Sequence, residues 1–221
     1  VTRAPAAFSE RDTTWFPRQP VAVLHVSGPI TAGTGRGPSG LFGEQAGSTD
    51  FTRACQEIAA DRRIRGVVVR IDSPGGSATA SELMWNALRQ LAEAKPTVVS
   101  FGDIAASGGY YIASVGAEIF ATPNTLTGSI GIYAGTFALD DLFDRVGIDR
   151  AREGRGGTWD LFDGDSWDDD ERGIVVRFIE RAYGMFIAHV AESRGMSEEE
   201  ADARGRGRIY SGSDALAAQL I

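Results

Sequence analysis

Short apolar runs alternate with longer amphipathic stretches along this chain. Residues 21–26, 67–71 and 97–101 are rich in β-branched side chains, which predicts buried strands. Residues 51–60 and 77–94 have helical spacing; Asp50 is a candidate N-cap for the first, and Pro96 prevents continuation of the second. Further strands are predicted at 118–121 and 130–133, and further helices at 106–114, 137–146 and 168–194, with a last short helix introduced by a Ser197–Glu200 capping box.

Strands that alternate with helices predict an α/β layered domain built on βαβ units. We expect one such domain over residues 21–221. Residues 1–20 carry turn formers, charges and the apolar pair Trp15–Phe16, and are interpreted as an N-terminal arm. The Gly-, Ser- and Thr-rich stretch 28–47 is interpreted as a loop.

Composition narrows the function classes. The formal net charge is −8, which argues against a nucleic-acid partner, because phosphate binding needs a basic face. A single cysteine, Cys55, rules out an intrachain disulfide, and no apolar run reaches the length of a membrane span. The acidic run 168–171 suits the first turn of a helix better than a metal site, so neither a metal nor another cofactor is expected.

The first candidate site is the turn Asp72-Ser-Pro-Gly-Gly76, which follows the second predicted strand. Proline fixes one φ angle, and two glycines free the next ones. Such a turn can aim backbone N–H groups into a cleft at the carboxyl end of the sheet and stabilise an oxyanion. The alternative is a plain connection between a strand and a helix.

The second candidate site is the run Ala105-Ala-Ser-Gly-Gly-Tyr-Tyr111, which follows the third strand. Ser107 lies between small residues at a turn from strand to helix, where a nucleophile can be exposed. The alternative is that Ser107 only caps the helix. Because both segments end neighbouring parallel strands, we expect them to face one cleft.

A serine nucleophile needs a base, and the chain offers few candidates. Its two histidines, His25 and His189, fall within a predicted strand and a predicted long helix. Its single lysine, Lys95, precedes Pro96 in a turn position that is usually solvated. A catalytic lysine must instead be desolvated to be neutral near pH 7. None of the three is therefore expected to be the base.

Several runs taken together resemble one family. "RGVVVRIDSPGGSATASEL", "KPTVVSFGDIAASGGYYIAS", "IFATPNTLTGSIGIY" and "GRIYSGSDALAAQLI" occur in the order and spacing of the signal peptide peptidase A (protease IV) family. The resemblance covers roughly residues 21–221. It implies a ClpP/crotonase-like spiral of ββα units and a serine endopeptidase of the Ser–Lys type that degrades hydrophobic or signal-peptide-like peptides.

The resemblance also implies roles for individual residues. Ser107 corresponds to the nucleophile. The backbone of Gly75 or Gly76, together with the N–H of Gly108, corresponds to the oxyanion hole. Ser129 corresponds to a hydroxyl that orients the lysine amine.

One departure from the family pattern concerns the base. Single-domain members carry the lysine in a stretch that corresponds to residues 154–160, which here contains no lysine. Arg155 cannot replace it, because a guanidinium stays protonated in proteins. In tandem members the amino-terminal half supplies the lysine and the carboxy-terminal half the serine, and this chain resembles the latter.

These resemblances lead to expectations about partners. We expect peptide substrates, a lysine-bearing amino-terminal half, assembly into a homo-oligomer, and bacterial membrane association only through segments absent here. The fragment alone is expected to be inactive. Two alternatives remain: a scaffold or interaction domain that has lost its base, and a crotonase-like acyl-CoA enzyme.

Overall fold

The computed structural model describes residues 20–35, 44–148, 153–156, 161 and 166–221. The expected N-terminal arm therefore lies outside the described residues, apart from Pro20. The chain divides into two compact units, one of residues 1–131 and 185–221 and the other of residues 132–184. The long helix α5 (Asp169–Arg194) contributes to both units.

The first unit is built on a six-stranded sheet with the order β1-β4-β5-β7-β8, in which β6 also pairs with β5. All pairs are parallel except β7 with β8. A small second sheet joins β2 to β3. The strands are β1 (Val21–Ser27), β2 (Ile30–Thr31), β3 (Ala46–Gly47), β4 (Gly66–Ser73), β5 (Thr97–Ala106), β6 (Glu118–Phe120), β7 (Leu126–Gly128) and β8 (Ile209–Ser211).

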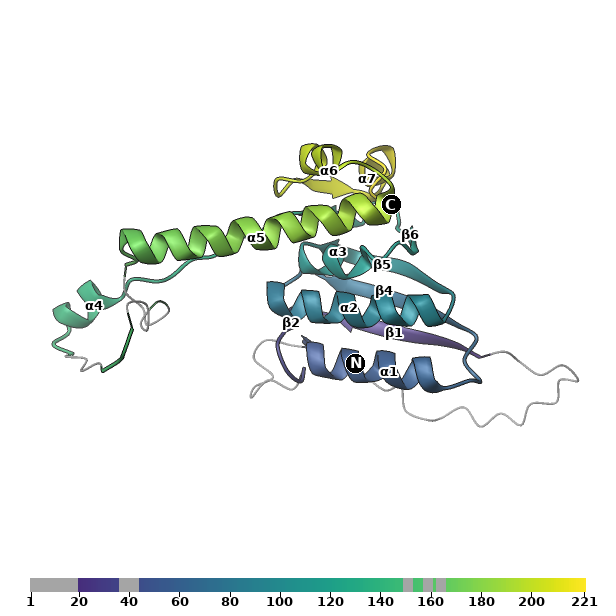
Figure 1. The fold of residues 1–221 in the computed structure, drawn as a ribbon, viewed down its shortest axis with the longest axis horizontal. Helices are drawn as coiled ribbons and strands as arrows, with labels where there is room; N and C mark the ends of the chain where they lie inside the picture. The colour runs from purple at the N-terminus through teal and green to yellow at the C-terminus, as the bar shows by residue number, and fades with distance from the viewer. Residues whose placement is uncertain (1–19, 36–43, 149–152, 157–160, 162–165) are drawn as a thin grey trace, which may run out of the picture. The chain divides into compact units, whose positions relative to one another are not determined.

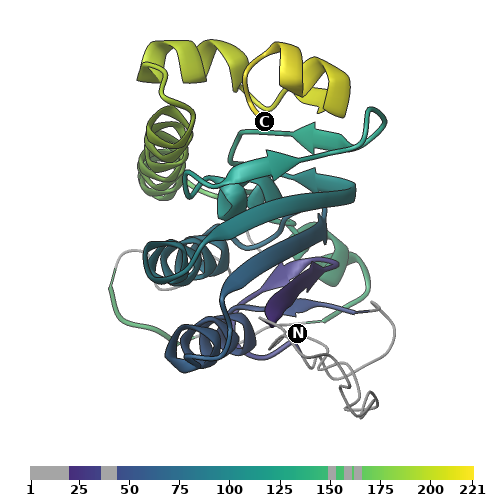
Figure 2. The same cartoon turned by 90° about the vertical axis from the view of Figure 1, so that its right-hand side faces the viewer.

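Helices α1 (Ser48–Ala60), α2 (Ala78–Ala94) and α3 (Gly108–Ala113) lie along one face of this sheet (Figures 1 and 2). The strand residues that face them form the core, for example Val69, Ile71 and Val99, each fully buried. Burial of such aliphatic side chains drives this layer packing. The short helices α6 (Glu198–Arg204) and α7 (Gly212–Ala217) follow near the end of the chain. The predicted α/β class is confirmed.

The second unit contains the helix α4 (Asp140–Arg145) and the first part of α5. The helix predicted at 137–146 is thus shorter than expected. Helix α5 is capped by Asp168, whose Oδ1 accepts from Glu171 N at 2.8 Å while Glu171 Oε2 accepts from Asp168 N. The acidic run thus supplies its own capping box at the start of this helix.

Two further expectations were wrong in detail. Residues 130–133, expected to be a strand, form none in the described structure; the strand in this region is β7, which ends at Gly128. The chain turns after β7 because Gly128 and Ser129 both have positive φ angles, 80° and 49°. Asp50 does not cap α1, which begins at Ser48; its carboxylate accepts from Gly35 N at 2.9 Å and so holds the preceding loop.

Candidate active site

The two glycine-rich turns meet at the carboxyl ends of β4 and β5, as the sequence predicts. Ser73 pairs with Ala105 in the parallel ladder, so both turns leave the sheet side by side. A Cβ added to Gly75 would lie 2.8 Å from the Cβ of Ser107 and 2.6 Å from Gly108 N. Gly75 also has a φ of +100°, which side-chain-bearing residues rarely adopt. Only glycine permits this close approach.

Ser107 occupies the N-cap position of α3 but does not use its side chain as a cap. Its backbone is held on both sides, because Ser107 N donates to Gly128 O at 2.9 Å and Tyr111 N donates to Ser107 O at 2.8 Å. Its φ of 51° is unusual for a residue other than glycine, and such strain clusters at functional sites. The half-buried hydroxyl hydrogen-bonds to no described residue. Capping alone therefore does not explain this serine.

The expected oxyanion donors differ in their availability. The N–H of Gly75 donates to Ser73 Oγ at 3.1 Å, and that hydroxyl donates to Gly28 O at 2.7 Å. The N–H groups of Gly76 and Gly108 have no hydrogen-bond partner among the described residues. The geometry thus favours Gly76 and Gly108 as donors, whereas Gly75 provides the close approach.

Residue Ile30 holds the Gly76 side of the turn in place. Ile30 N donates to Gly75 O at 2.9 Å, and Ser77 N donates to Ile30 O at 3.0 Å. These two bonds bracket Gly76, whose own N–H is left unused. A Cβ on Gly76 would lie 2.2 Å from Ile30 O, so this position also requires glycine. No local pattern in the sequence indicates this role of Ile30.

Ser129 follows β7 directly and lies next to Ser107, because Ser107 N donates to the preceding Gly128 carbonyl. Its backbone N–H donates to Arg208 O at 2.6 Å, which ties it to the start of β8. The Ser129 hydroxyl forms no hydrogen bond within the described part of the chain. It is therefore available to an incoming polar group.

Lys95 lies elsewhere, as expected. It is the C-cap of α2, and its ammonium donates to Asp61 O and Ile64 O, both at 2.8 Å. Strand β5 separates it from Ser107, a span of roughly 30 Å at about 3.3 Å per residue. Lys95 is thus a structural residue of the loop between α1 and β4.

Comparison with known proteins identifies the family of this chain. The model of peptidase family S49 matches residues 89–221. The chain is also 32% identical over 208 residues to a Synechocystis protein named as a protease, of which it spans 69%.

This chain belongs to peptidase family S49.

Longer relatives extend beyond the region that the chain matches. The chloroplastic serine protease SPPA of Arabidopsis thaliana is 32% identical over 92% of this chain, and protease 4 of Salmonella typhi is 31% identical over 91%. The chain spans only 30% and 32% of these two proteins. A ClpP1 mutant from Listeria monocytogenes has the same fold, with a TM-score of 0.57 at 17% identity over 90% of this chain and 88% of that one. The ClpP-like fold and the family resemblance are confirmed.

The two histidines of this chain lie in other surroundings. His25 is exposed on the edge strand β1, and His189 stacks on Trp85 in the first unit. In the stretch 154–160, where single-domain relatives are expected to carry the lysine, residues 157–160 lie outside the described residues. The described part holds no cluster of His, Cys, Asp and Glu suited to a metal, and none of its helices could span a membrane.

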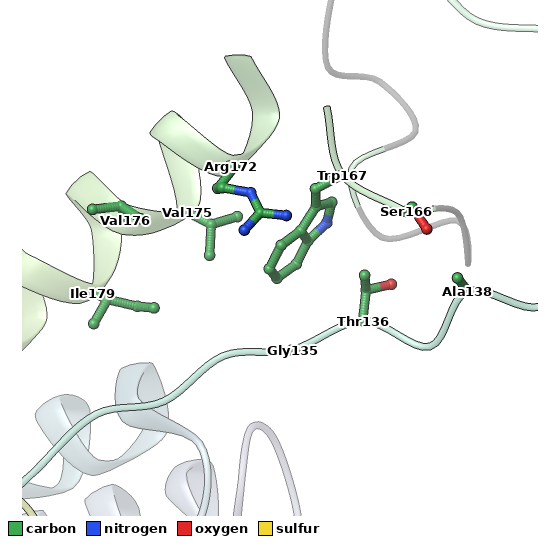
Figure 3. Close-up of a pocket in the computed structure, with 9 residues that line it drawn as sticks. All are labelled: Gly135, Thr136, Ala138, Ser166, Trp167, Arg172, Val175, Val176 and Ile179. Carbon is green, nitrogen blue, oxygen red and sulfur yellow. The ribbon is translucent and has the colours of Figure 1, made fainter. Parts of the chain in front are cut away.

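The second unit of this S49 domain carries a groove of about 480 Å³ that the sequence did not predict. Figure 3 shows the Arg172 guanidinium beside the Trp167 indole, with aliphatic side chains of α5 next to them. Trp167 Nε1 donates to Leu161 O at 2.7 Å, which fixes the ring. The lining residues are Gly135, Thr136, Ala138, Ser166, Trp167, Arg172, Val175, Val176 and Ile179. None of them belongs to the predicted site.

Proposed function

We propose that this S49 domain supplies the nucleophile and the oxyanion donors of a Ser–Lys endopeptidase. In this proposal Ser107 is the nucleophile, and the lysine comes from a segment outside this chain. The observation that carries the proposal is the close approach of Gly75 to Ser107: a Cβ added to Gly75 would lie 2.8 Å from the Cβ of Ser107. This approach supports the proposal, because the Ser107 hydroxyl and the N–H groups of Gly76 and Gly108 belong to these two turns and have no hydrogen-bond partner among the described residues.

The reaction would proceed through two acyl-transfer steps. Ser107 Oγ attacks the carbonyl carbon of the scissile peptide and gives its proton to the lysine amine. The N–H groups of Gly76 and Gly108 donate to the oxyanion as it forms. The lysine returns the proton to the leaving amine, and the peptide C–N bond breaks. Water then attacks the acyl carbon and gives a proton to the lysine amine; as the ester bond to Ser107 Oγ breaks and the acid product leaves, the lysine returns that proton to Ser107 Oγ.

The incoming lysine must be neutral and correctly placed. Its pKa must fall from about 10.4 towards neutrality, which requires a site that excludes water. The Ser129 hydroxyl is adjacent to Ser107 and hydrogen-bonds to no described residue, so it can accept from or donate to the amine. Ser129 is therefore the proposed orienting group. A lysine-bearing amino-terminal half would complete the site.

The substrate and assembly follow from the family. Hydrophobic peptides such as signal-peptide remnants would bind as an extended strand near the Gly75–Gly76 turn. Assembly into a homo-oligomer would enclose the site, and any membrane association would come from segments outside this chain. The relatives' names, which include signal peptide peptidase and protease 4, support this substrate class.

Substitution of Ser107 in the full-length enzyme tests the proposal. With a hydrophobic fluorogenic peptide, we expect Ser107→Ala to lower kcat by about 10³-fold or more. The matched control is Ser77→Ala, since Ser77 caps α2 through Ala80 N and lies beside the same turn. We expect that control to retain most of its activity.

Labelling with a fluorophosphonate separates the rival function. Full-length protein that folds but neither reacts with the probe nor cleaves peptides would favour a scaffold domain and would reject the proposal. Labelling that is lost in Ser107→Ala and kept in Ser77→Ala supports Ser107 as the nucleophile.

A further inference from the structure

Two side chains, from helices α3 and α5, converge on the carboxylate of Glu82 in α2. Glu82 lies in α2, and its Oε2 accepts a hydrogen bond from the Tyr111 hydroxyl of α3. The same oxygen lies 3.3 Å from Nε2 of His189 in α5. Glu82 thus joins the three helices through polar contacts at this point.

Tyr111 presents its hydroxyl to Glu82 from a buried ring. The residue is only 4% exposed, and its ring packs on Phe186 with centroids 4.6 Å apart. Burial, together with the hydrogen bond to Glu82, raises the pKa of Tyr111 well above its usual range. The phenol therefore remains a hydrogen-bond donor at every pH at which the enzyme would work.

His189 completes the cluster through aromatic contacts. Its ring stacks on Trp85 at 3.6 Å with an angle of 16° and meets the edge of Tyr111 at 5.3 Å. Trp85 Nε1 in turn donates to Ser114 O at 2.6 Å, at the end of α3. Helix α3 is therefore held to α2 at two points, by Glu82 near its middle and by Trp85 at its end.

The cluster matters because α2 and α3 carry the two proposed oxyanion donors. Gly76 immediately precedes the N-cap of α2, and Gly108 is the first residue of α3. The two helices touch at their beginnings, where a Cβ on Gly108 would lie 2.4 Å from Ser81 Oγ. Helix α3 has six residues, all of them buried, and its Tyr110 hydroxyl also donates to Leu220 O at 2.6 Å. The hydrogen bond from Tyr111 to Glu82 ties α3 to α2, and so helps to set where Ser107 and Gly108 stand relative to Gly76.

We propose that Glu82 is a positioning residue, which acts through Tyr111 to hold Ser107 and Gly108 in register with Gly76. This inference rests on the proposed function. An oxyanion hole works only when its donors lie about 2.7–3.1 Å from the oxygen. A small tilt of α3 therefore reduces stabilisation of the transition state more than it reduces the affinity for substrate. Loss of the acceptor should accordingly reduce kcat and leave KM nearly unchanged.

Variants of the full-length enzyme test the inference. We expect Glu82→Ala and Tyr111→Phe each to lower kcat by about 10- to 100-fold, with KM changed less than about twofold. Glu82→Gln should recover most of the activity, because its amide oxygen still accepts from Tyr111. The matched control is Glu93→Ala, which removes a carboxylate of the same helix that only pairs with the exposed Arg89. It should behave as wild type.

A peptide aldehyde gives a readout that general destabilisation would not produce. The aldehyde forms a tetrahedral adduct with the serine, so its Ki should rise in parallel with the loss of kcat/KM. The Ki of a cleaved product peptide should stay constant. Tyr111→Phe removes one oxygen and keeps the packing, so it remains informative if Glu82→Ala fails to fold. Full kcat in Tyr111→Phe, or parallel losses of product and aldehyde binding, would overturn the inference. Activity retained in Ser107→Ala would instead reject the proposed function itself.

Discussion

Ser107 and Ser129 both have positive φ angles, at the ends of two strands that are hydrogen-bonded neighbours. Each such conformation costs on the order of 1–3 kcal/mol and persists only where the surrounding structure enforces it. Here the enforcing contacts are the bond from Ser107 N to Gly128 O and the bond from Ser129 N to Arg208 O. Both residues directly follow the ends of their strands, and their hydroxyls hydrogen-bond to no described group.

Gly75→Ala should abolish activity in the full-length enzyme and lower the thermal stability. The new Cβ would lie 2.6 Å from Gly108 N and 2.8 Å from Ser107 Cβ, so the two turns must separate. Gly116→Ala is the matched control, because Gly116 also has a positive φ, +80°, but no atom within 4 Å of an added Cβ. We expect the control to lose about 1–2 kcal/mol of stability and keep its kcat/KM. Equal activity in both variants would contradict this account of Gly75.

Cys55 should be unreactive in the folded protein. Burial raises the pKa of its thiol from an ordinary 9.0 to about 12, so at pH 8 almost no thiolate exists. We expect a thiol reagent such as dithionitrobenzoate to react only after unfolding in guanidinium. The raised pKa contributes stability that is complete below pH 9 and is lost as the pH rises towards 12. Rapid reaction of the native protein at pH 8 would contradict the burial.

The sequence predicted which residues lie close together at the site, but not which hydrogen bonds their backbone N–H groups form. The position of Ser107 and Gly75 at the ends of neighbouring parallel strands followed from the order of apolar runs. The bond from Gly75 N to Ser73 Oγ, which leaves Gly76 and Gly108 as the available donors, did not. A side chain that hydrogen-bonds to its own turn occupies a backbone N–H that could otherwise bond to a neighbouring strand or to a ligand. The sequence alone does not specify which of these partners the N–H takes.

At the scale of elements, the long apolar strands and helices were predicted more reliably than their ends. Strands β1, β4 and β5 and helix α2 lie where their patterns place them. The strand expected at 130–133 failed because Ile130 is buried outside any strand, with its carbonyl accepting from Gly207 N at 2.8 Å. An apolar run indicates that its side chains are buried, and residues outside strands can be buried too. The cluster at Glu82 joins residues 107 positions apart, which local pattern cannot reveal.

Lys95→Gln should leave catalysis intact and weaken the connection between α1 and β4. The ammonium donates to two backbone carbonyls, Asp61 O and Ile64 O, and its loss leaves both without that partner. Hydrogen bonds from a charged donor contribute about 1.5–3 kcal/mol. We therefore expect a lower denaturation midpoint and an unchanged kcat in the full-length enzyme. A large fall in kcat with unchanged stability would show that Lys95 takes part in the reaction.

At the scale of the whole molecule, the proposed mechanism requires a base from outside this chain. The proposed nucleophile and the two proposed donors lie together within the first unit, yet the chain has a single lysine, which lies at the opposite end of β5. Assembly of identical copies would add only further copies of Lys95. The longer relatives, of which this chain spans about a third, have the additional length that a second half requires.

We therefore expect the isolated 221-residue chain to fold without peptidase activity. In the proposed mechanism Ser107 needs an amine to take its proton, and no described residue places one beside it; an unactivated hydroxyl attacks a peptide far too slowly. The measurement is turnover of a hydrophobic fluorogenic peptide by the chain alone, by its Ser107→Ala variant, and by the chain co-expressed with the rest of the protein. The first two should match the buffer, and the third should cleave. Turnover by the chain alone that disappears in Ser107→Ala would place a base within these residues and would refute the division of the site between two segments.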